Sequence, residues 1–352
     1  MQDDEPIPMT MADAFDKHIE ICEAEDYAQD TIYAHRSRLG MFLDWLDDKT
    51  SVEETTDLNR RHLQDYRIHR KKSVGKVTLK SDMDTIRVFI RNMEDYDAIR
   101  PGLHEYVRSP SLQGDEGQRS DHLTIERGEQ IQENLRKYQW ASVQHVLFEL
   151  LWNTGMRIGA AHSLDEDDFL KEKKALRLRH RPESGTTLKN GERGERVVAI
   201  ADVVADVIQD YLDSPERPDD PVDEYGRAPL FASPSGGGGR YHKNTLRNYV
   251  YAVTRPCVTE GGCPHEDYDP DLCEAAQNNN DACKCPSSKA PHALRSGALT
   301  RQIKNEVPES LISDRADVSV EVLKAHYAEL SEEEQMELRR KWFDEEYGQG
   351  SA

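Results

Sequence analysis

A polar stretch near the end of the first third of the chain constrains the fold more than any other feature. Residues 107–122, VRSPSLQGDEGQRSDH, combine Ser, Pro, Gly and charged residues and show no apolar period. A chain of 352 residues is long enough for two or three domains. We therefore expect a linker at 109–121, one folded unit at 1–108, a second at 122–346, and a flexible tail at 347–352.

The first unit has the apolar spacing of helices. Thr10 and Asp13 have the spacing of a capping box at the start of one helix. In residues 83–93, MDTIRVFIRNM, apolar side chains recur at intervals of three and four, which places them on one helix face. We expect a small helical unit with these residues, and the isolated Cys22, in its core.

The second unit mixes helices with a few strands. Thr124 is placed to cap one helix, and residues 141–153, ASVQHVLFELLWN, form a strongly apolar helix that stops at Gly155. Residues 174–200 alternate as strands do, with Asn190-Gly191 as a hairpin turn signal. The pattern predicts a mainly α protein with a small β-sheet, an α+β fold.

The charge of the chain admits two interpretations. A net charge of −21 ordinarily argues against a nucleic-acid partner. Proteins of salt-loving cells, however, carry acidic surfaces whatever they bind. At molar salt the Debye length is about 3 Å, so a surplus of carboxylates repels DNA little beyond contact. We favour the halophile interpretation, in which local basic clusters matter more than the total.

Two features bear on location. No stretch of about 18 apolar residues is present, so we expect no membrane span. The first ten residues, MQDDEPIPMT, are acidic and do not resemble a signal peptide. We expect a cytoplasmic protein.

Residues 59–80 reverse the overall charge locally. They hold eight Lys or Arg residues against one acid, Asp65. Such a cluster is typical of contact with a phosphate backbone, and the alternative is a solvated loop between two helices. We favour the first and expect DNA contacts from Arg60, Arg61, Arg67, Arg70, Lys71, Lys72, Lys76 and Lys80.

A trio near the C-terminus has the residue types of a phosphate site. His292 and Arg295 are three residues apart on an expected helix, so they share a face. A guanidinium supplies a planar fork of donors to a phosphate, and an imidazole supplies another. Tyr327 is a possible nucleophile, because a phenol can form covalent intermediates. Alternatively, the His-x-x-Arg spacing is fortuitous and the tyrosine is only packed.

Two further cations precede this trio. Arg157 follows a glycine turn beside apolar helices, and a buried Arg needs an anionic partner, either a protein carboxylate or a bound phosphate. Lys189 lies at the expected hairpin turn. It is either solvated, or placed to reach a DNA groove or to donate a proton.

Five of the six cysteines fall between residues 257 and 285. A reduced cytosol disfavours disulfides, so we interpret this segment as an insert with a structural zinc site. Reduced thiols in an acidic loop are the alternative. Four ligands are expected from the candidates Cys257, Cys263, His265, Cys273, Cys283 and Cys285.

The sequence resembles the tyrosine recombinase family, of the phage-integrase type, and its matching motifs occur in the same order as in that family. NTGMRIGAAHSLDEDDF is similar to the first arginine motif of that family and KNGERGERVVAI to its β-hairpin lysine region. HALR, at 292–295, is similar to the second His/Arg motif, and Tyr327 stands where the nucleophile belongs. The resemblance covers roughly residues 9–330 and implies a helical core-binding domain that closes over DNA, followed by a catalytic domain.

The resemblance implies roles for the catalytic residues. Arg157, Arg295 and His292 would stabilise the attacked phosphate, Tyr327 would form a 3′-phosphotyrosine, and Lys189 would protonate the departing 5′-hydroxyl. It implies no cofactor for catalysis, double-stranded DNA as partner, and a homo-tetramer acting on two duplexes. The function implied is site-specific recombination or integration.

The sequence departs from the family pattern at two places. Ala160 stands where an acidic residue is usual, and Arg315 to Val318 replace a second His or Trp before the tyrosine. His326 adjoins Tyr327 and is a possible substitute, and Arg193 is an alternative to Lys189. The alternatives for function are a DNA-binding relative without turnover and a type IB topoisomerase-like enzyme that relaxes DNA.

Overall fold

The computed structural model describes residues 5–113, 121–259, 261–265, 269, 272–328, 330–337 and 340. The chain forms two compact units, residues 1–119 and 120–352, and the boundary between them falls within the stretch 109–121. The expected tail at 347–352 lies outside the described residues. No described helix combines the length and apolar character that crossing a bilayer requires.

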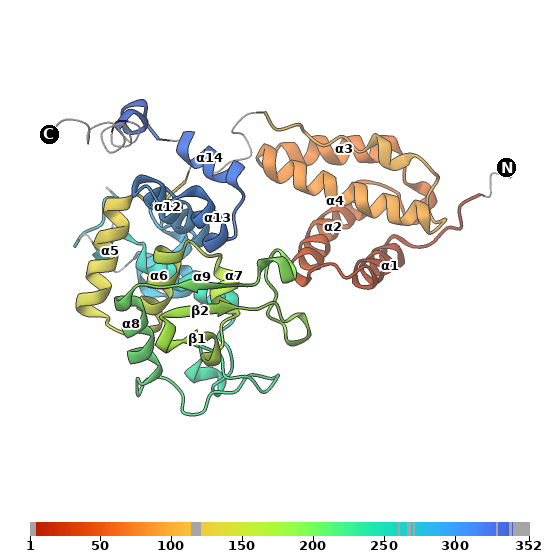
Figure 1. Cartoon of the computed structure of the whole chain (residues 1–352). Coiled ribbons are helices and arrows are strands. Elements are labelled where there is room, and N and C mark those ends of the chain that lie inside the picture. The colour runs from red at the N-terminus through yellow and green to blue at the C-terminus, as the bar shows by residue number, and fades with distance from the viewer. Residues whose placement is uncertain are drawn as a thin grey trace. The chain divides into compact units, whose positions relative to one another are not determined.

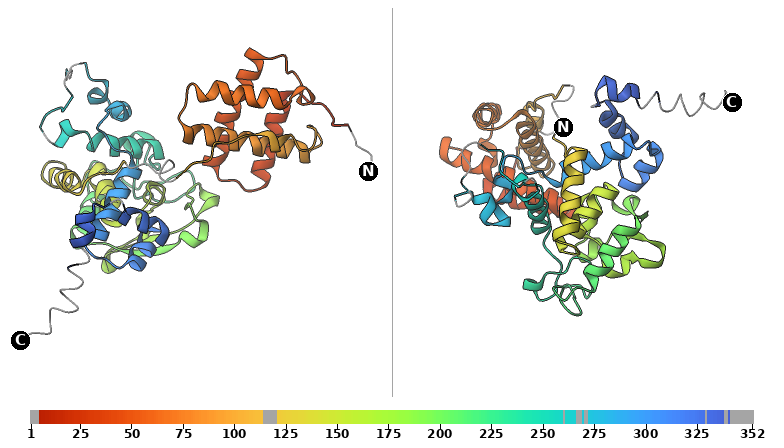
Figure 2. Two further views of the ribbon diagram at one scale, coloured as in Figure 1. Left: turned by 90° about the horizontal axis from the view of Figure 1, so that it is seen from above. Right: turned by 90° about the vertical axis from the view of Figure 1, so that its left-hand side faces the viewer.

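In the described part of the first unit, four α-helices pack around a main apolar core, and the left view of Figure 2 shows how they lie together. The predicted N-cap at Thr10 is confirmed, since its hydroxyl accepts a hydrogen bond from the Asp13 amide at 3.1 Å. The Asp13 carboxylate accepts from the Thr10 hydroxyl at 2.7 Å and not from the Thr10 amide that a capping box would use. Phe42, Phe89 and Ile90 are fully buried. The helices are α1 (Met11–Ala24), α2 (Gln29–Lys49), α3 (Arg60–Lys71) and α4 (Lys76–Asp95), with 3-10 turns at Thr55–Asp57 and Leu103–Tyr106.

The second unit has a larger apolar core, around which helices and a small sheet pack (Figure 1). The predicted mainly α fold with a small sheet is confirmed. Its helices are α5 (Ile125–Tyr138), α6 (Val143–Thr154), α7 (Ile158–His162), α8 (Asp202–Leu212), α9 (Lys243–Val253), α10 (Pro256–Thr259), α11 (Glu274–Gln277), α12 (Pro291–Lys304), α13 (Glu309–Ala316) and α14 (Val320–Ala328). Its strands are β1 (Phe169–Leu170), β2 (Ala175–Leu178) and β3 (Arg196–Ala199).

The sheet is antiparallel in the order β1-β2-β3, and Leu178 pairs with Arg196. The prediction of a tight hairpin turn at Asn190-Gly191 is wrong. Asn190 has φ −101°, whereas a two-residue type I′ turn needs positive φ at both central residues. Short 3-10 turns occupy much of the connection between β2 and β3 instead.

A tight turn between α6 and α7 brings the chain against α12. Gly155 ends α6 with φ +66°, a conformation in which a side chain would be strained. A Cβ at this position would also come within 3.2 Å of Leu299 on α12. This close approach places Arg157, the residue that precedes α7, beside the buried face of α12.

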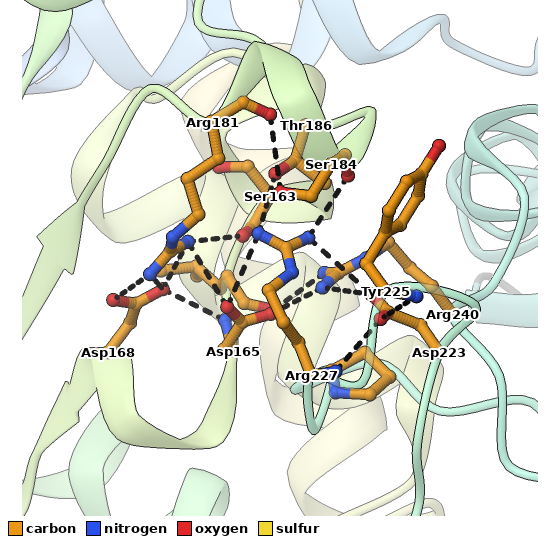
Figure 3. A network of polar contacts seen from close by, with 12 residues as sticks. Ser163, Asp165, Asp168, Arg181, Ser184, Thr186, Asp223, Tyr225, Arg227 and Arg240 are labelled. Carbon is orange, nitrogen blue, oxygen red and sulfur yellow. Dashed lines mark hydrogen bonds and ion pairs between the residues drawn. The ribbon is translucent and has the colours of Figure 1, made fainter.

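A buried ion-pair network fixes the far end of α7 (Figure 3). Arg181 forms a fork with Asp168, at 2.9 and 3.0 Å. Arg240 pairs with Asp165 and, at 3.1 Å, with Asp223. Arg240 also donates to the backbone oxygens of His162 and Leu164, at 2.8 and 2.9 Å, so the network holds the C-terminus of α7 in place.

Candidate active site

Arg295 lies on the buried face of α12, with only 5% of its surface exposed. Pro291 at the first turn starts this helix. The Arg295 guanidinium donates to the backbone oxygens of Gly155 at 2.9 Å and of Ala316 at 2.8 Å. It therefore joins the α6–α7 turn to the end of α13.

Arg157 and Arg295 both contact Asp317, the first through its carboxylate and the second through its backbone oxygen. Arg157 Nη1 lies 2.5 Å from the Asp317 Oδ2, and the Asp317 backbone oxygen accepts from Arg295 at 3.3 Å. Asp317 follows α13 in a left-handed conformation with φ 53°, which aspartate tolerates better than most residues. Ala160, where the family usually has an acid, is buried. The carboxylate that contacts Arg157 thus comes from Asp317 instead.

Asn190 and Arg196 complete the cluster around Asp317. Asn190 donates to the other Asp317 oxygen at 2.7 Å. Arg196, at the start of β3, donates to the Arg315 backbone oxygen at 2.9 Å. We call Arg157, Arg196, Arg295, Asp317 and Asn190 the Asp317 cluster.

The Asp317 cluster has more positive than negative charge, because three guanidiniums surround one carboxylate. Burial lowers the pKa of Arg295 to about 9, an effect that Arg157 and Arg196 increase and Asp317 opposes. The guanidinium is still charged at neutral pH. Such a surplus of fixed donors is suited to a phosphate, which carries negative charge on its non-bridging oxygens.

The remaining predicted catalytic residues are not among the five residues of the cluster. His292 is exposed in the first turn of α12, and Lys189 is exposed just before Asn190. Arg193, the alternative to Lys189, is exposed as well. Asn190, adjacent to Lys189, contacts Asp317, so the segment that carries the lysine borders the cluster.

Tyr327 lies near the end of α14, half-buried. Its hydroxyl faces the backbone oxygen of Gln335, 3.5 Å away. Within the described part of the chain, that oxygen is the recorded hydrogen-bond partner of the phenol, and neither Arg157 nor Arg295 contacts it. The structure therefore brings the two arginines together without placing the phenol on them.

The basic segment 59–80 forms α3 and the start of α4. Arg70 forms an ion pair with the buried Asp82 at 2.9 Å, and Lys80 forms one with Asp84 at 2.5 Å. Arg60 lies over the Tyr106 ring at 3.5 Å. Arg67 is half-buried. The exposed remainder is Arg61, Lys71, Lys72 and Lys76.

The cysteine-rich insert forms a pocket of about 190 Å³. Cys283 is exposed and does not line it. Cys285 Sγ lies 3.8 Å from His265 Nε2. Five of the six candidate ligands line the pocket: Cys257, Cys263, His265, Cys273 and Cys285.

Three residues of the Asp317 cluster, Asn190, Arg196 and Asp317, were not predicted as site residues from the sequence, and Asn190 was noted only as part of a turn signal. Asp317 drew notice only as a departure from the family pattern, although its position ten residues before Tyr327 was the available signal. Arg196 gave no signal, because a cation at the start of a strand is ordinarily solvated. Its role follows from the register of β2 and β3, which apolar alternation does not specify.

The sequence matches no protein-family model and no curated protein. Solved structures do match. The Tn1549 transposon integrase in complex with a circular intermediate DNA has a TM-score of 0.62 and 14% identity over 94% of this chain and 99% of that one. A lambda integrase dimer bound to a COC' core site has a TM-score of 0.59 and 12% identity, over 91% and 77%.

A lambda integrase tetramer bound to a Holliday junction is similar to the same degree, with a TM-score of 0.58 and 12% identity over 88% of this chain and 78% of that one. These similarities cover both units of the chain. The chain has the fold of the tyrosine recombinases and integrases, and the predicted resemblance in fold is confirmed.

Proposed function

We propose that the protein is a site-specific DNA recombinase or integrase that cleaves and rejoins strands through a phosphotyrosine at Tyr327. The observation that carries the proposal is the meeting of Arg157 and Arg295, 138 positions apart in the sequence (295 − 157), at a cluster with surplus positive charge. The integrase fold and the order of the motifs supply the context.

In the proposed reaction, the negatively charged scissile phosphate binds at the Asp317 cluster and compensates its excess positive charge. The Tyr327 oxygen bonds to phosphorus while the bond from phosphorus to the 5′-oxygen breaks. The phenol proton passes to water, and Lys189 protonates the leaving 5′-oxygen. Attack by the 5′-hydroxyl of another strand reverses the steps. The bond energy stays in the phosphotyrosine, so strand exchange needs no nucleotide cofactor.

The proposed site requires two rearrangements when DNA binds. Arg157 must share or release the Asp317 carboxylate, and the Tyr327 phenol must leave the Gln335 oxygen. The phenol contact is long, at 3.5 Å, and therefore contributes little stability. Half-burial of the tyrosine leaves it within reach of solvent.

For the partner, we propose double-stranded DNA, with four copies of the chain acting on two duplexes. We expect contacts with DNA phosphates from the exposed Arg61, Lys71, Lys72 and Lys76. The similarity to a lambda integrase tetramer bound to a Holliday junction supports the assembly.

Capture of a covalent adduct tests the proposal without knowledge of the target. A pool of duplexes with a random sequence around a nick is incubated with the protein, so that cleavage releases a short fragment and traps the enzyme. The expected result is an SDS-resistant adduct with wild type and none with Tyr327→Phe. Binding that enriches a sequence from the pool, with no adduct from wild type, would contradict it.

A second candidate is a DNA-binding relative without turnover. The observation in its favour is that Asp317 already supplies an anion to Arg157. The pool experiment separates the two, since this candidate enriches sequences but forms no adduct. A topoisomerase-like activity is distinguished by relaxation of a supercoiled plasmid at concentrations where the protein is monomeric.

We also propose a structural zinc ion in the insert, held by four of the five side chains that line its pocket. These side chains must draw closer together to bind the ion, since among these described residues no three ligand atoms lie within 4.8 Å of one another. Thr254 and Lys289, which flank the insert, are joined by a 2.8 Å hydrogen bond just before α12. Zinc would thus brace the start of the helix that carries His292. Replacement of Cys273 and Cys285 by Ser should lower the zinc content, whereas Cys283→Ser should leave it unchanged.

A further inference from the structure

Three buried side chains of the first unit bring nitrogen and sulfur atoms to one point. His18 Nε2 lies 3.0 Å from His35 Nδ1. Cys22 Sγ lies 3.5 Å from the first and 3.8 Å from the second. Among the described residues, this is the only group of three His, Cys, Asp or Glu side chains with ligand atoms within 4.8 Å of one another.

The local sequence explains why these atoms converge. His18 and Cys22 are four residues apart on α1, and so lie one turn apart on the same face. His35 comes from the facing side of α2. Cys22 packs with Ile19 and Ile32 in a small apolar cluster, so the three polar side chains are enclosed by hydrocarbon.

A hydrogen-bonded histidine pair would account for part of this arrangement. The two rings stack at 5.2 Å with an interplanar angle of 10°, and one hydrogen bond satisfies the two facing nitrogens. It does not account for Cys22, whose sulfur lies near both nitrogens at once although a thiol has a single weak proton to donate. A shared cation uses all three lone pairs.

The distances match those of a zinc site. Zinc lies about 2.0–2.1 Å from a histidine nitrogen and about 2.3 Å from a cysteine sulfur. In a tetrahedron of that size, neighbouring ligand atoms are separated by about 3.3–3.6 Å. The two sulfur distances are close to this range, and the nitrogens need to separate by only about 0.3 Å.

We propose that His18, Cys22 and His35 form a zinc site that joins α1 to α2, independent of the cysteine-rich insert. Zinc suits a mixed set of imidazole and thiolate ligands better than magnesium or calcium, which prefer oxygen. The three side chains would supply three of the four ligands that zinc prefers.

Asn92 of α4 supports the proposed site from behind. Its amide nitrogen Nδ2 lies 3.2 Å from His18 Nδ1, the nitrogen that faces away from the cluster. Metal binding at Nε2 requires the amide to turn over, so that its oxygen accepts a hydrogen bond from Nδ1–H and the lone pair is on Nε2. Phe89, edge-on to the His18 ring at 5.5 Å, packs beside the same ring.

Zinc content of full-length variants tests the proposal. Cys22→Ser and His35→Gln are compared with wild type and with His69→Gln, which replaces an exposed imidazole of α3 in the same unit. Zinc per chain is measured after gel filtration. Each cluster variant should bind about one zinc fewer than wild type, and His69→Gln should bind the same amount. Folded cluster variants with the wild-type zinc content would overturn the proposal.

A measurement on the wild-type chain covers the case in which the variants fail to fold. The chain is stripped with a chelator, zinc is returned to one half, and labelling of each cysteine by iodoacetamide is followed by peptide mass spectrometry. Zinc should slow labelling of Cys22 about tenfold or more, since a metal-bound thiolate is a poor nucleophile. Equal rates at Cys22 with and without zinc would overturn the proposal. The insert cysteines are read separately.

Discussion

The second unit contains two groups of arginines, and they differ in charge balance. In the network of Figure 3, Arg181, Arg227 and Arg240 face three buried aspartates. The more exposed Arg179 touches its edge. In the Asp317 cluster, three arginines face one carboxylate.

The difference indicates different uses for the same residue type. A balanced network has its charges compensated, and breaking it leaves buried carboxylates without partners. The Asp317 cluster has donors and charge to spare, which makes it suited to an external anion. One group holds α7 in place, and we propose that the other presents Arg157, which precedes the opposite end of α7, to a ligand.

The largest effect on stability is expected from the balanced network. Arg240→Ala leaves Asp165 and Asp223 buried without their main partner. The free energy of unfolding should fall by about 3–5 kcal/mol. Arg247→Ala, an exposed arginine of α9, is the matched control and should change it by about 0.5 kcal/mol or less. Urea denaturation measures both, and similar losses would contradict the assignment.

The largest effect on activity is expected from the Asp317 cluster. Arg157→Ala should lower the rate of adduct formation about 10²–10³-fold, because one donor to the developing charge is lost. The free energy of unfolding should change by about 1 kcal/mol or less, since the ion pair with Asp317 is partly exposed. An unchanged rate would remove Arg157 from the proposed site.

Asp317→Asn sharpens the comparison, since it increases the charge surplus of the cluster. The three arginines then lack their internal anion, and the free energy of unfolding should fall by about 1–2 kcal/mol. Sulfate should raise the free energy of unfolding of Asp317→Asn by more than it raises that of wild type. The general stabilising effect of sulfate acts equally on both proteins, so the excess measures binding at the cluster. Asp223→Asn in the balanced network is the control. Equal sulfate effects on the three proteins would contradict an anion site at Asp317.

A further effect, on acid stability, is expected from His162. Burial, followed by the charge of Arg240, lowers the pKa of His162 to about 4. The folded pKa is below the unfolded value of about 6.5, so the unfolded state binds the proton first as the pH falls. The contribution of neutral His162 is complete above pH 6.5 and is lost as the pH falls toward 4. His162→Gln should flatten this decline in urea denaturation. An unaltered slope would contradict it.

Local patterns predicted much of the fold. The cap at Thr10, the end of α6 at Gly155 and the mainly α class follow from short-range spacing, which the sequence displays directly. The turn between β2 and β3 could not be predicted in this way. Asn190-Gly191 has the composition of a tight turn, but Asn190 instead contacts Asp317, 127 residues away.

The candidate site was predictable only in part, for the same reason. Arg157 and Arg295 stand in recognisable motifs, whereas Asp317 and Arg196 depend on tertiary placement. His18, Cys22 and His35 were equally hidden, because their spacing along the chain matches no metal motif and their convergence requires the packing of α1 on α2. Polar contacts between residues far apart in the chain leave no periodic pattern in the sequence, so they are difficult to predict from it.

The central claim is that the charge surplus of the Asp317 cluster serves the scissile phosphate. Its most direct test uses a cleavage substrate whose scissile linkage is a neutral methylphosphonate. Wild type and Arg295→Ala are compared on the charged and the neutral linkage, and the adduct at Tyr327 is quantified. We predict that Arg295→Ala fails on the phosphate and recovers activity on the methylphosphonate, because the charge that needed the arginine is gone. Loss of activity to the same extent on both linkages would contradict the claim.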